Sequence, residues 1–364
     1  MRVLYFTNIP SPYRVEFFTE LNKHVELTVL FDRHKDKERN DKWFEENKFD
    51  FNYEFIRNFN PKKVISYIKK NYDVVVIGGY TQKNCVVAIE YMKMHKIPFY
   101  INADGGFVDP NDNIITKNLK KHFVSSASHW LSSGVGTNKY LTHYGAKEEN
   151  IHIYPFTSLR YKDGLKEIIK YEEKREKRKK YGYDYDRLFI SVGQFIHRKG
   201  YDLLIETVNK YNLKNVGFIV IGGGEEKENY EKLLKQYNIT NIHFIDFLKK
   251  EELFDHFKFS DAFVFLTRED IWGLVINEAI AYGLPIISTK QCLASLELLE
   301  EEYLYDVNDL ERLAKMIQKF VEYDNNKLEV LGKKMLQLSH KYTIENMAKV
   351  HKEIFERNLN NDKK

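Results

Sequence analysis

The chain has 364 residues, which is enough for two domains of ordinary size. Its 57 basic and 53 acidic residues leave a formal net charge of +4, too small to indicate a nucleic-acid partner. The sequence has no run of about 18 apolar residues, which excludes a membrane-spanning helix. Its two cysteines lie far apart, which excludes a disulfide scaffold. Because no secretory signal is recognisable either, the sequence predicts a cytoplasmic protein.

Short apolar segments alternate with stretches of helical periodicity along the whole chain. Apolar strands between helices are typical of parallel sheets that are covered on both faces. The segments fall into two series, so the sequence predicts an α/β protein with two doubly wound, Rossmann-like domains. The expected strands are 3–6, 27–31, 74–77, 99–101 and 151–154 in the first series, and 188–192, 217–221, 243–245, 262–266 and 286–288 in the second.

These two series set the expected domain borders. We expect an amino-terminal domain over residues 1–160, a linker over 161–186, a carboxy-terminal domain over 187–342, and a final helix with a short tail over 343–364. The linker contains the charge run 174–180, which indicates a solvated helical face or, less commonly, a basic patch for phosphate or membrane.

Two strand ends in the first domain carry residues suited to chemistry. Asp104 precedes Gly105 after the strand at 99–101, and a glycine beside an acid lets a substrate approach closely. Gly79 and Tyr80 end the preceding strand, so we expect them to line the same cleft.

The loop after the first strand is stiffened by prolines and leads into Tyr13 and Arg14. We expect both side chains in the cleft, with Arg14 as a candidate for contact with an acceptor or a phosphate. The alternative is that Arg14 lies on the surface of a helix that begins here.

In the second domain, the strand at 188–192 ends at Gly193, and Gln194, Arg198 and Lys199 follow. When a sugar diphosphate loses its sugar, negative charge develops on the diphosphate that leaves. Fixed cations stabilise this charge more in the transition state than in the ground state. We expect Lys199 in that role, whereas Arg198 is equally consistent with an exposed turn.

Two further loops follow neighbouring strands of the second domain. Gly222 and Gly223 follow the strand at 217–221, where small residues let a ligand approach the backbone. Phe247 follows the next strand and either flanks the base or belongs to the core.

The most informative segment is 268–279, where Gly273 opens an expected helix whose free N–H groups can meet a phosphate. Glu269 and Asp270 precede this point, and Glu278 lies roughly 10 Å from it inside the helix. The spacing suits a nucleotide-sugar, with sugar hydroxyls at the first acid, the diphosphate at the helix end and ribose hydroxyls at the second acid. The other expected donor-binding residues here are Trp272, Leu274 and Val275.

This segment resembles the acid-x7-acid signature of retaining glycosyltransferases of the GT-B fold, family 4 (glycosyl transferases group 1). In that family the first acid is usually Glu. Here Asp270 holds its position and Glu269 precedes it, which leaves open the acid that faces the sugar. The family usually places Arg directly after the first glycine of the preceding motif and Lys five residues later; Gln194 replaces the Arg, and Lys199 keeps the Lys position.

The resemblance implies a retaining hexosyltransferase that moves a sugar from a nucleotide diphosphate, UDP by preference. The acceptor it implies is a hydroxyl of a glycan or lipid-linked glycan. The expected process is biosynthesis of lipopolysaccharide, capsule or another surface polysaccharide. It implies two domains facing a cleft, with the last helix crossing back to the first domain. Catalytic roles fall to Lys199, Asp270 and Asp104, the last near the reacting carbon. No cofactor and no metal are expected, since the Asp-x-Asp pattern at 184–186 precedes a strand instead of following one.

Two other functions fit the same architecture. One is a nucleotide-sugar epimerase, and the other is a non-catalytic donor-binding subunit of a glycosylation complex, which the departures at Gln194 and Asp270 favour.

Residues 117–124 combine lysines with apolar residues at helical spacing. The pattern predicts either peripheral contact with an anionic membrane, at the inner face of the plasma membrane, or an ordinary amphipathic helix packed on the sheet.

Overall fold

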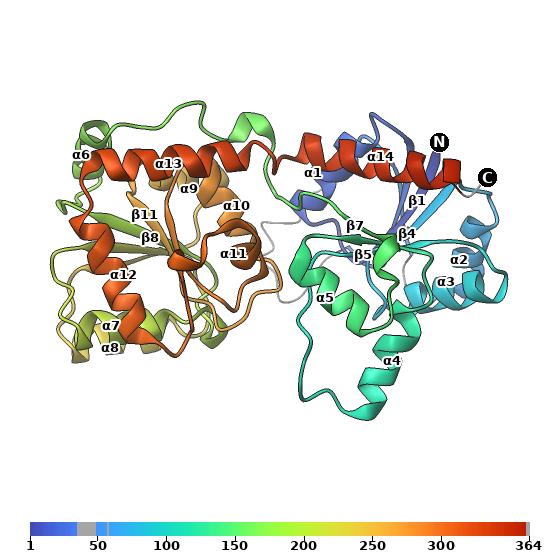
Figure 1. The fold of residues 1–364 in the computed structure, drawn as a ribbon, viewed down its shortest axis with the longest axis horizontal. Coiled ribbons are helices and arrows are strands. Elements are labelled where there is room, and N and C mark those ends of the chain that lie inside the picture. Colours follow the sequence, from blue (N-terminus) through green and yellow to red (C-terminus); the bar gives the residue numbers. More distant parts are fainter. Residues whose placement is uncertain (35–48, 57, 362–364) are drawn as a thin grey trace. The chain divides into compact units, whose positions relative to one another are not determined.

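The computed structural model describes residues 1–34, 49–56 and 58–361, which form two compact units (Figure 1). Unit 1 contains Met1–Arg160 and Tyr342–Lys364, and unit 2 contains Tyr161–Lys341. Each unit is a parallel sheet covered by helices on both faces, so the predicted class of two Rossmann-like α/β domains is confirmed. The units are described separately below.

The sheet of unit 1 has the strand order β3-β2-β1-β4-β5-β6-β7, and every neighbouring pair is parallel. Its strands are β1 (Arg2–Thr7), β2 (Glu26–Phe31), β3 (Asn52–Phe55), β4 (Val74–Ile77), β5 (Tyr100–Ala103), β6 (His129–Ser132) and β7 (Ile151–Ile153). Its α-helices are α1 (Pro12–Leu21), α2 (Pro61–Ile68), α3 (Lys83–Met94), α4 (Ile114–Val124), α5 (Val135–His143) and α14 (Ile344–Asn361).

Alternate residues of β1 point to the two faces of this sheet. Leu4 and Phe6 join the core cluster that contains side chains of α2, α3 and α5. Tyr5 points to the other face, where its ring packs edge-on against Phe18 of α1. The described part of the chain thus places helices on both faces, as a parallel sheet requires.

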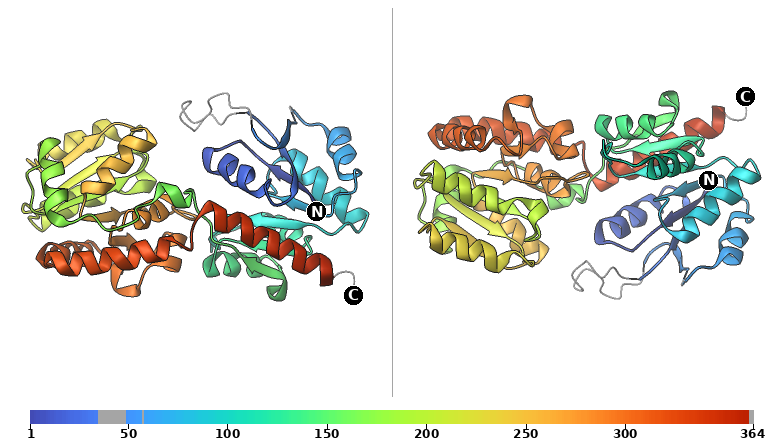
Figure 2. Two further views of the ribbon diagram at one scale, coloured as in Figure 1. Left: turned by 90° about the horizontal axis from the view of Figure 1, so that it is seen from above. Right: turned by 90° about the horizontal axis from the view of Figure 1, so that it is seen from below.

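The last helix, α14, returns to unit 1 and packs beside α1, as predicted for the final segment (Figure 2). Its buried positions Ile344, Met347, Ile354 and Phe355 recur at helical spacing, so one stripe of the helix is removed from water. The imidazole of His351 lies in the same stripe against Phe17, with ring centroids 4.7 Å apart.

The sheet of unit 2 has the strand order β10-β9-β8-β11-β12-β13, again with parallel pairs throughout. Its strands are β8 (Leu188–Val192), β9 (Gly217–Ile221), β10 (Ile242–Ile245), β11 (Ala262–Phe265), β12 (Ile286–Thr289) and β13 (Leu304–Tyr305). Its α-helices are α6 (Tyr171–Lys180), α7 (Tyr201–Lys210), α8 (Lys227–Gln236), α9 (Lys250–Phe259), α10 (Leu274–Ala281), α11 (Leu293–Leu298), α12 (Leu310–Glu322) and α13 (Asn325–Ser339).

Helices α7, α8 and α12 lie on one face of this sheet, and α9 and α10 lie on the other (Figure 1). The first layer closes over Phe189 and Phe218, whose side chains share a buried cluster with Leu204 of α7 and Ile317 of α12. Helix α13 packs against α10 from outside.

Three strands were missing from the sequence-based set. The edge strand β3 is half exposed, β6 has only the apolar pair Trp130 and Leu131, and β13 has two residues. None of them presents a continuous apolar run, which is the feature that identified the other strands.

Residues 161–186, expected as a linker, belong to unit 2 and include α6. The charge run in this helix was interpreted as a solvated face, and most of its side chains are indeed exposed. Arg178 differs, because its side chain is completely buried and forms a two-pronged ion pair with Asp261, at 2.7 and 2.8 Å. One stripe of α6 therefore packs into the protein through charged groups.

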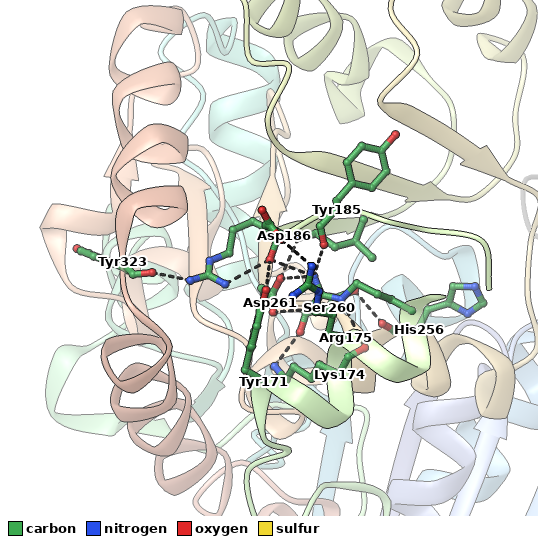
Figure 3. Close-up of polar contacts among 12 residues, drawn as sticks. Tyr171, Lys174, Arg175, Tyr185, Asp186, His256, Ser260, Asp261 and Tyr323 are labelled. Atoms are coloured by element: carbon green, nitrogen blue, oxygen red, sulfur yellow. Dashed lines mark hydrogen bonds and ion pairs between the residues drawn. The ribbon is translucent and has the colours of Figure 1, made fainter. Parts of the chain in front are cut away.

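The Arg178 ion pair fastens α6 to the two central strands of unit 2. Asp261 immediately precedes β11, and its carboxylate also accepts a hydrogen bond from the backbone N–H of Leu188, the first residue of β8, at 2.9 Å. Figure 3 shows Ser260 and Asp261 facing Lys174 of α6, whose ammonium donates to the carbonyl of Ser260 at 2.8 Å.

We expect Arg178→Ala to destabilise unit 2 by about 3–5 kcal/mol, because it leaves the buried Asp261 carboxylate without its counter-charge. Hydrogen exchange of the β8 and β11 amides measures this loss as a drop in the free energy of their opening.

The matched control is Arg175→Ala, one turn earlier on α6. Arg175 pairs with Asp186 at 3.3 Å, but the two side chains are 45% and 78% exposed, so its loss should cost less than about 1 kcal/mol. Equal losses in the two variants would show that the buried pair does not hold these strands.

Candidate functional site

The strand order of unit 2 reverses between β8 and β11. From β8 the chain proceeds outward to β9 and β10, and from β11 it proceeds the other way to β12 and β13. The loops that follow β8 and β11 therefore diverge and leave a crevice at the carboxyl ends of the strands, which is where ligands bind in open α/β sheets. The first of these loops carries Lys199, and the second carries Asp270 and Gly273.

Lys199 and Asp270 meet at this edge. The Lys199 ammonium forms an ion pair with Asp270 Oδ2, and the two side chains are only 12% and 15% exposed. Arg198 lies further out, 45% exposed, with its guanidinium 3.9 Å from the same carboxylate oxygen. An ammonium has three donors, so Lys199 can hold Asp270 and still donate to a phosphate.

The loop before Gly273 is braced on both sides. Arg268 forms a two-pronged ion pair with Asp202 of α7, at 2.9 and 2.6 Å, and its N–H donates to the carbonyl of Arg198 at 2.8 Å. The N–H of Asp270 donates to the carbonyl of Gln291 at 2.8 Å. The loop is thereby held against the segments that follow β8 and β12.

This bracing separates the roles of the two neighbouring acids. Glu269 has an exposed side chain, and its carbonyl oxygen accepts hydrogen bonds from Arg198 and from Thr267 Oγ1. Asp270 turns its carboxylate to the two cations. Within unit 2, Asp270 and not Glu269 belongs to the charged cluster.

Gly273 begins α10 in a conformation that suits glycine. Its φ is +88°, and a Cβ at this position would lie 2.7 Å from Cys292 Sγ. No side chain caps the helix, so its first N–H groups remain available at the crevice. Leu274 and Val275 form this first turn half-buried, and Glu278 follows one turn later, also half-buried.

The remaining predicted residues of unit 2 divide into two groups. Gly193, Gly222, Gly223 and Phe247 follow β8, β9 and β10, so they lie along the same sheet edge, with Phe247 43% exposed. Gln194 is exposed in the loop after β8.

Trp272 differs from that group because it is 2% exposed and donates its indole N–H to Asn277 Oδ1 at 2.9 Å. Its ring supports the loop from within and presents no open face.

Arg14 and Asp104 meet in unit 1. Arg14, on α1, is 4% exposed, and its guanidinium forms an ion pair with the Asp104 carboxylate after β5. Arg14 is thus not on a helix surface, which was the alternative from the sequence. Burial alone would lower the pKa of Arg14, but the Asp104 carboxylate raises it well above the ordinary value, so the guanidinium keeps its charge.

Three residues that sequence reasoning missed complete this cluster. Asn102 and Tyr154 each donate to Asp104 Oδ1 at 2.8 Å, and Tyr5 donates to Asn102 Oδ1 at 2.7 Å. Burial raises the pKa of the Tyr5 and Tyr154 hydroxyls well above their usual range, so both stay protonated donors. Asn102 could have been found, because it lies two residues before Asp104 and therefore on the same side of the strand.

The other predicted residues of unit 1 lie around strand ends. Tyr13 packs its ring edge-on against Phe156 at 5.8 Å. Gly79 and Tyr80 follow β4, and Tyr80 shares a hydrogen bond with the hydroxyl of Tyr140. Gly105 follows Asp104 and is half-buried.

Within the described ranges, no group of three or more His, Cys, Asp or Glu side chains is placed to hold a metal ion. The two acids of the Asp-x-Asp pattern instead lie near basic side chains of α6. Asp184 is 3.8 Å from Lys179, and Asp186 is 3.3 Å from Arg175.

Part of the chain is similar in sequence to known proteins. Residues 170–337, nearly all of unit 2, match the family model described as glycosyl transferases group 1. The O-antigen biosynthesis glycosyltransferase WclY of Escherichia coli is 28% identical over 166 residues, which are 45% of this chain and 45% of that protein. The lipopolysaccharide core biosynthesis glycosyltransferase LpsE of Rhizobium meliloti is 29% identical over 135 residues, 36% of this chain and 38% of that protein. The matched part thus spans less than half the length of these relatives.

Solved structures match over nearly the whole chain. HepE of Anabaena in complex with UDP superposes with a TM-score of 0.78 at 15% identity, covering 98% of this chain and 100% of that one. WaaG, a glycosyltransferase involved in lipopolysaccharide biosynthesis, gives 0.64 at 14% identity, covering 97% and 99%. At these identities the likeness shows the fold alone. The chain therefore has the GT-B fold, and most of its second unit matches the family model of glycosyl transferases group 1.

We expect Gly273→Ala to destabilise unit 2 by two contributions. One is the free-energy cost of a non-glycine residue at positive φ. The other is roughly 1–3 kcal/mol, because the new methyl group overlaps Cys292 Sγ. The free energy of opening of α10, measured by hydrogen exchange, reports the loss.

Gly182→Ala is the control, because its φ is +84° and no atom lies within 4 Å of the added Cβ. Gly182→Ala therefore carries only the free-energy cost of a non-glycine residue at positive φ. Adding Cys292→Ala to Gly273→Ala should restore part of the difference; no restoration would mean that the sulfur contact does not position this helix.

Proposed function

We propose that the chain is a retaining glycosyltransferase that transfers a sugar from UDP to an acceptor hydroxyl during surface polysaccharide or glycolipid biosynthesis. The observation that carries the proposal is the convergence of Lys199, Asp270 and the uncapped start of α10 at the switch point of the unit 2 sheet. The group 1 domain in unit 2 and the likeness to HepE crystallised with UDP support the donor assignment.

The donor chemistry follows from the charges at this edge. The diphosphate meets the first N–H groups of α10, and Lys199 donates to the same phosphates while Asp270 holds its ammonium in place. As the glycosidic bond breaks, negative charge grows on the leaving phosphate, and these fixed positive groups stabilise it in the role that a metal would otherwise fill. Glu278, farther along α10, accepts hydrogen bonds from the ribose hydroxyls.

Asp104 in unit 1 serves the acceptor. Its carboxylate already receives hydrogen bonds from Arg14, Asn102 and Tyr154, so its position is fixed. A carboxylate held in this way is suited to orient an incoming hydroxyl or to face positive charge at the reacting carbon, and Tyr13 beside Arg14 adds an aromatic surface.

Product analysis separates this proposal from its two alternatives. With a UDP-sugar and no acceptor, a new sugar epimer seen by NMR would indicate an epimerase. Donor binding without transfer across a panel of acceptors would indicate a binding subunit. Transfer with an unchanged anomeric configuration supports a retaining enzyme, and an inverted product contradicts it.

We expect Lys199→Ala to lower kcat roughly a hundredfold to a thousandfold, because it removes a fixed charge from the leaving group. Glu278→Ala should instead weaken UDP binding about tenfold to a hundredfold through the loss of charged hydrogen bonds to the ribose. Steady-state kinetics and calorimetry with UDP distinguish the two effects.

Lys210→Ala, at the exposed end of α7, is the control and should leave both constants unchanged. Near-normal turnover by Lys199→Ala, with the fold intact by circular dichroism, would contradict the proposed donor site.

We further propose that α4 brings unit 1 to an anionic membrane. Among the described residues, no helix is long and apolar enough to cross a bilayer. The first half of α4 instead exposes Ile114, Ile115 and Leu119, at 79%, 81% and 55%, beside the exposed lysines Lys117 and Lys121. Phe123 and Val124, expected in the same surface, are buried on the sheet side and anchor the helix.

The chemistry of this face fits an anionic bilayer surface. Aliphatic side chains can enter the acyl boundary, while each lysine gains about 1 kcal/mol from the negative surface potential. A membrane-bound position would bring the enzyme to lipid-linked acceptors.

We expect Ile114→Ser with Ile115→Ser to reduce binding to phosphatidylglycerol vesicles at least tenfold, because two aliphatic anchors worth about 1.5–3 kcal/mol each are lost. Co-sedimentation with vesicles that contain phosphatidylglycerol, and with vesicles of phosphatidylcholine alone, measures the effect.

Leu296→Ser is the control, because Leu296 is an exposed aliphatic residue (45%) on α11, which belongs to unit 2 and not to unit 1. Unchanged co-sedimentation of the α4 variant, or no binding by the unaltered protein, would exclude this surface.

A further inference from the structure

Unit 1 contains a cavity of about 700 Å³ that lies apart from Asp104. Its walls are the starts of β6 and β7, the loops that precede them, and the last turns of α14. Asp104 follows the carboxyl end of β5, whereas this cavity opens at the amino ends of the neighbouring parallel strands. It therefore lies at the opposite edge of the sheet from the ion pair of Arg14 and Asp104.

Two of the lining side chains, His129 and His152, belong to a row of three stacked rings that crosses the sheet. The ring of Tyr100 stacks on that of His129 at 4.9 Å, and His129 stacks on His152 at 5.5 Å. Asn358 of α14, only 5% exposed, places its amide 3.0 Å from the Tyr100 hydroxyl and 2.9 Å from His152 Nε2. Strands and helix together thus hold these polar side chains in place.

The charges around His152 leave the cavity positive. Arg357 donates to His152 Nδ1 at 3.0 Å, and Lys147 lies in the loop before β7. Burial, together with the neighbouring His129 and Arg357, lowers the pKa of His152 to about 4, so its imidazole is neutral at pH 7. Among the described residues that line the cavity, Glu149 is the sole carboxylate opposite the two cations.

We propose that this cavity binds an anionic saccharide, a sugar that carries a carboxylate or a phosphate. Arg357 and Lys147 hold the anion, and the amide and hydroxyl side chains of the wall, such as Asn150 and Ser128, pair with the ring hydroxyls. The volume falls in the range of about 300–1,000 Å³ that is usual for small-molecule sites. The inference rests on unit 1 alone and does not depend on the proposed transferase activity.

Two other ligand classes fit less well. An apolar ligand lacks partners, because Ala127 is the only aliphatic side chain among the described lining residues. A metal ion would have the two histidines, but within the described ranges no third His, Cys, Asp or Glu joins them in a ligating arrangement. The side chains of the cavity wall therefore favour a ligand that carries both a charge and hydroxyl groups.

The test is an NMR titration of the ring signals of His129 and His152 in the full-length protein at pH 7. The probes are glucuronate, glucose 6-phosphate, glucose and inorganic phosphate. We expect one or both of the charged sugars to bind at least tenfold more tightly than glucose and than inorganic phosphate, and the comparison of the two identifies the anion. Arg357→Gln should weaken that binding about tenfold or more.

Lys349→Gln is the matched control on the same helix, since Lys349 is exposed and its nearest carboxylate is Glu353 at 3.8 Å. It should leave binding unchanged. Equal affinity for glucose, equal affinity for inorganic phosphate, an unaffected Arg357→Gln variant, or no binding of any probe would each overturn the proposal.

The pH dependence gives a second readout. The groups that face His152 are His129 of β6, Arg357 and Asn358 of α14, and Lys147 and Glu149 of the preceding loop. A bound anion favours the protonated imidazole, so the pKa of His152 should rise above its value of about 4 in the free protein. Affinity for glucuronate, which stays ionised over this range, should therefore increase as the pH falls from 7 toward 5. A pKa that the charged sugars leave unmoved would contradict the site.

Discussion

The buried carboxylate of Asp261 is the interaction on which the organisation of unit 2 depends. It binds the Arg178 guanidinium and the first N–H of β8 while it stands at the start of β11. The amino ends of the two central strands are thus fixed to each other and to α6. The opposite ends of the same two strands lead to Lys199 and Asp270. The ion pair of Arg178 and Asp261 therefore stabilises the strands that position the candidate donor site, although it lies at their other ends.

The two units use buried charge in different ways. In unit 1 the Asp104 carboxylate is surrounded by protein donors, which leaves a fixed orienting group with little freedom. In unit 2 the described contacts of the Lys199 ammonium include one carboxylate, that of Asp270, so the ammonium keeps donors for a ligand. Such a contrast suits a protein in which one unit positions an acceptor and the other stabilises a leaving group.

Much of the fold could be predicted because the signals are local. An apolar run between helices identifies a buried strand, and that rule found β1, β2, β4, β8, β9 and β11 near their observed bounds. It failed for β6, which begins with a histidine and is completed by partners on each side, and for the exposed edge strand β3. The helix start at Gly273 was also predictable, because the positive φ that glycine allows is a property of the chain at that point.

The sequence by itself determined the two series of strands, the class of the second unit, and the residue types at the ends of strands. Only the tertiary structure decided which charges meet. Arg14 and Asp104 are 90 residues apart, Arg178 and Asp261 are 83 apart, and Asn358 reaches His152 across 206 residues. The sequence pattern records periodicity over a few turns, whereas these pairings depend on how parallel strands are ordered in the sheet. That order brings distant residues together and buries the charged side chain of Arg178, although the composition of α6 is that of an exposed helix.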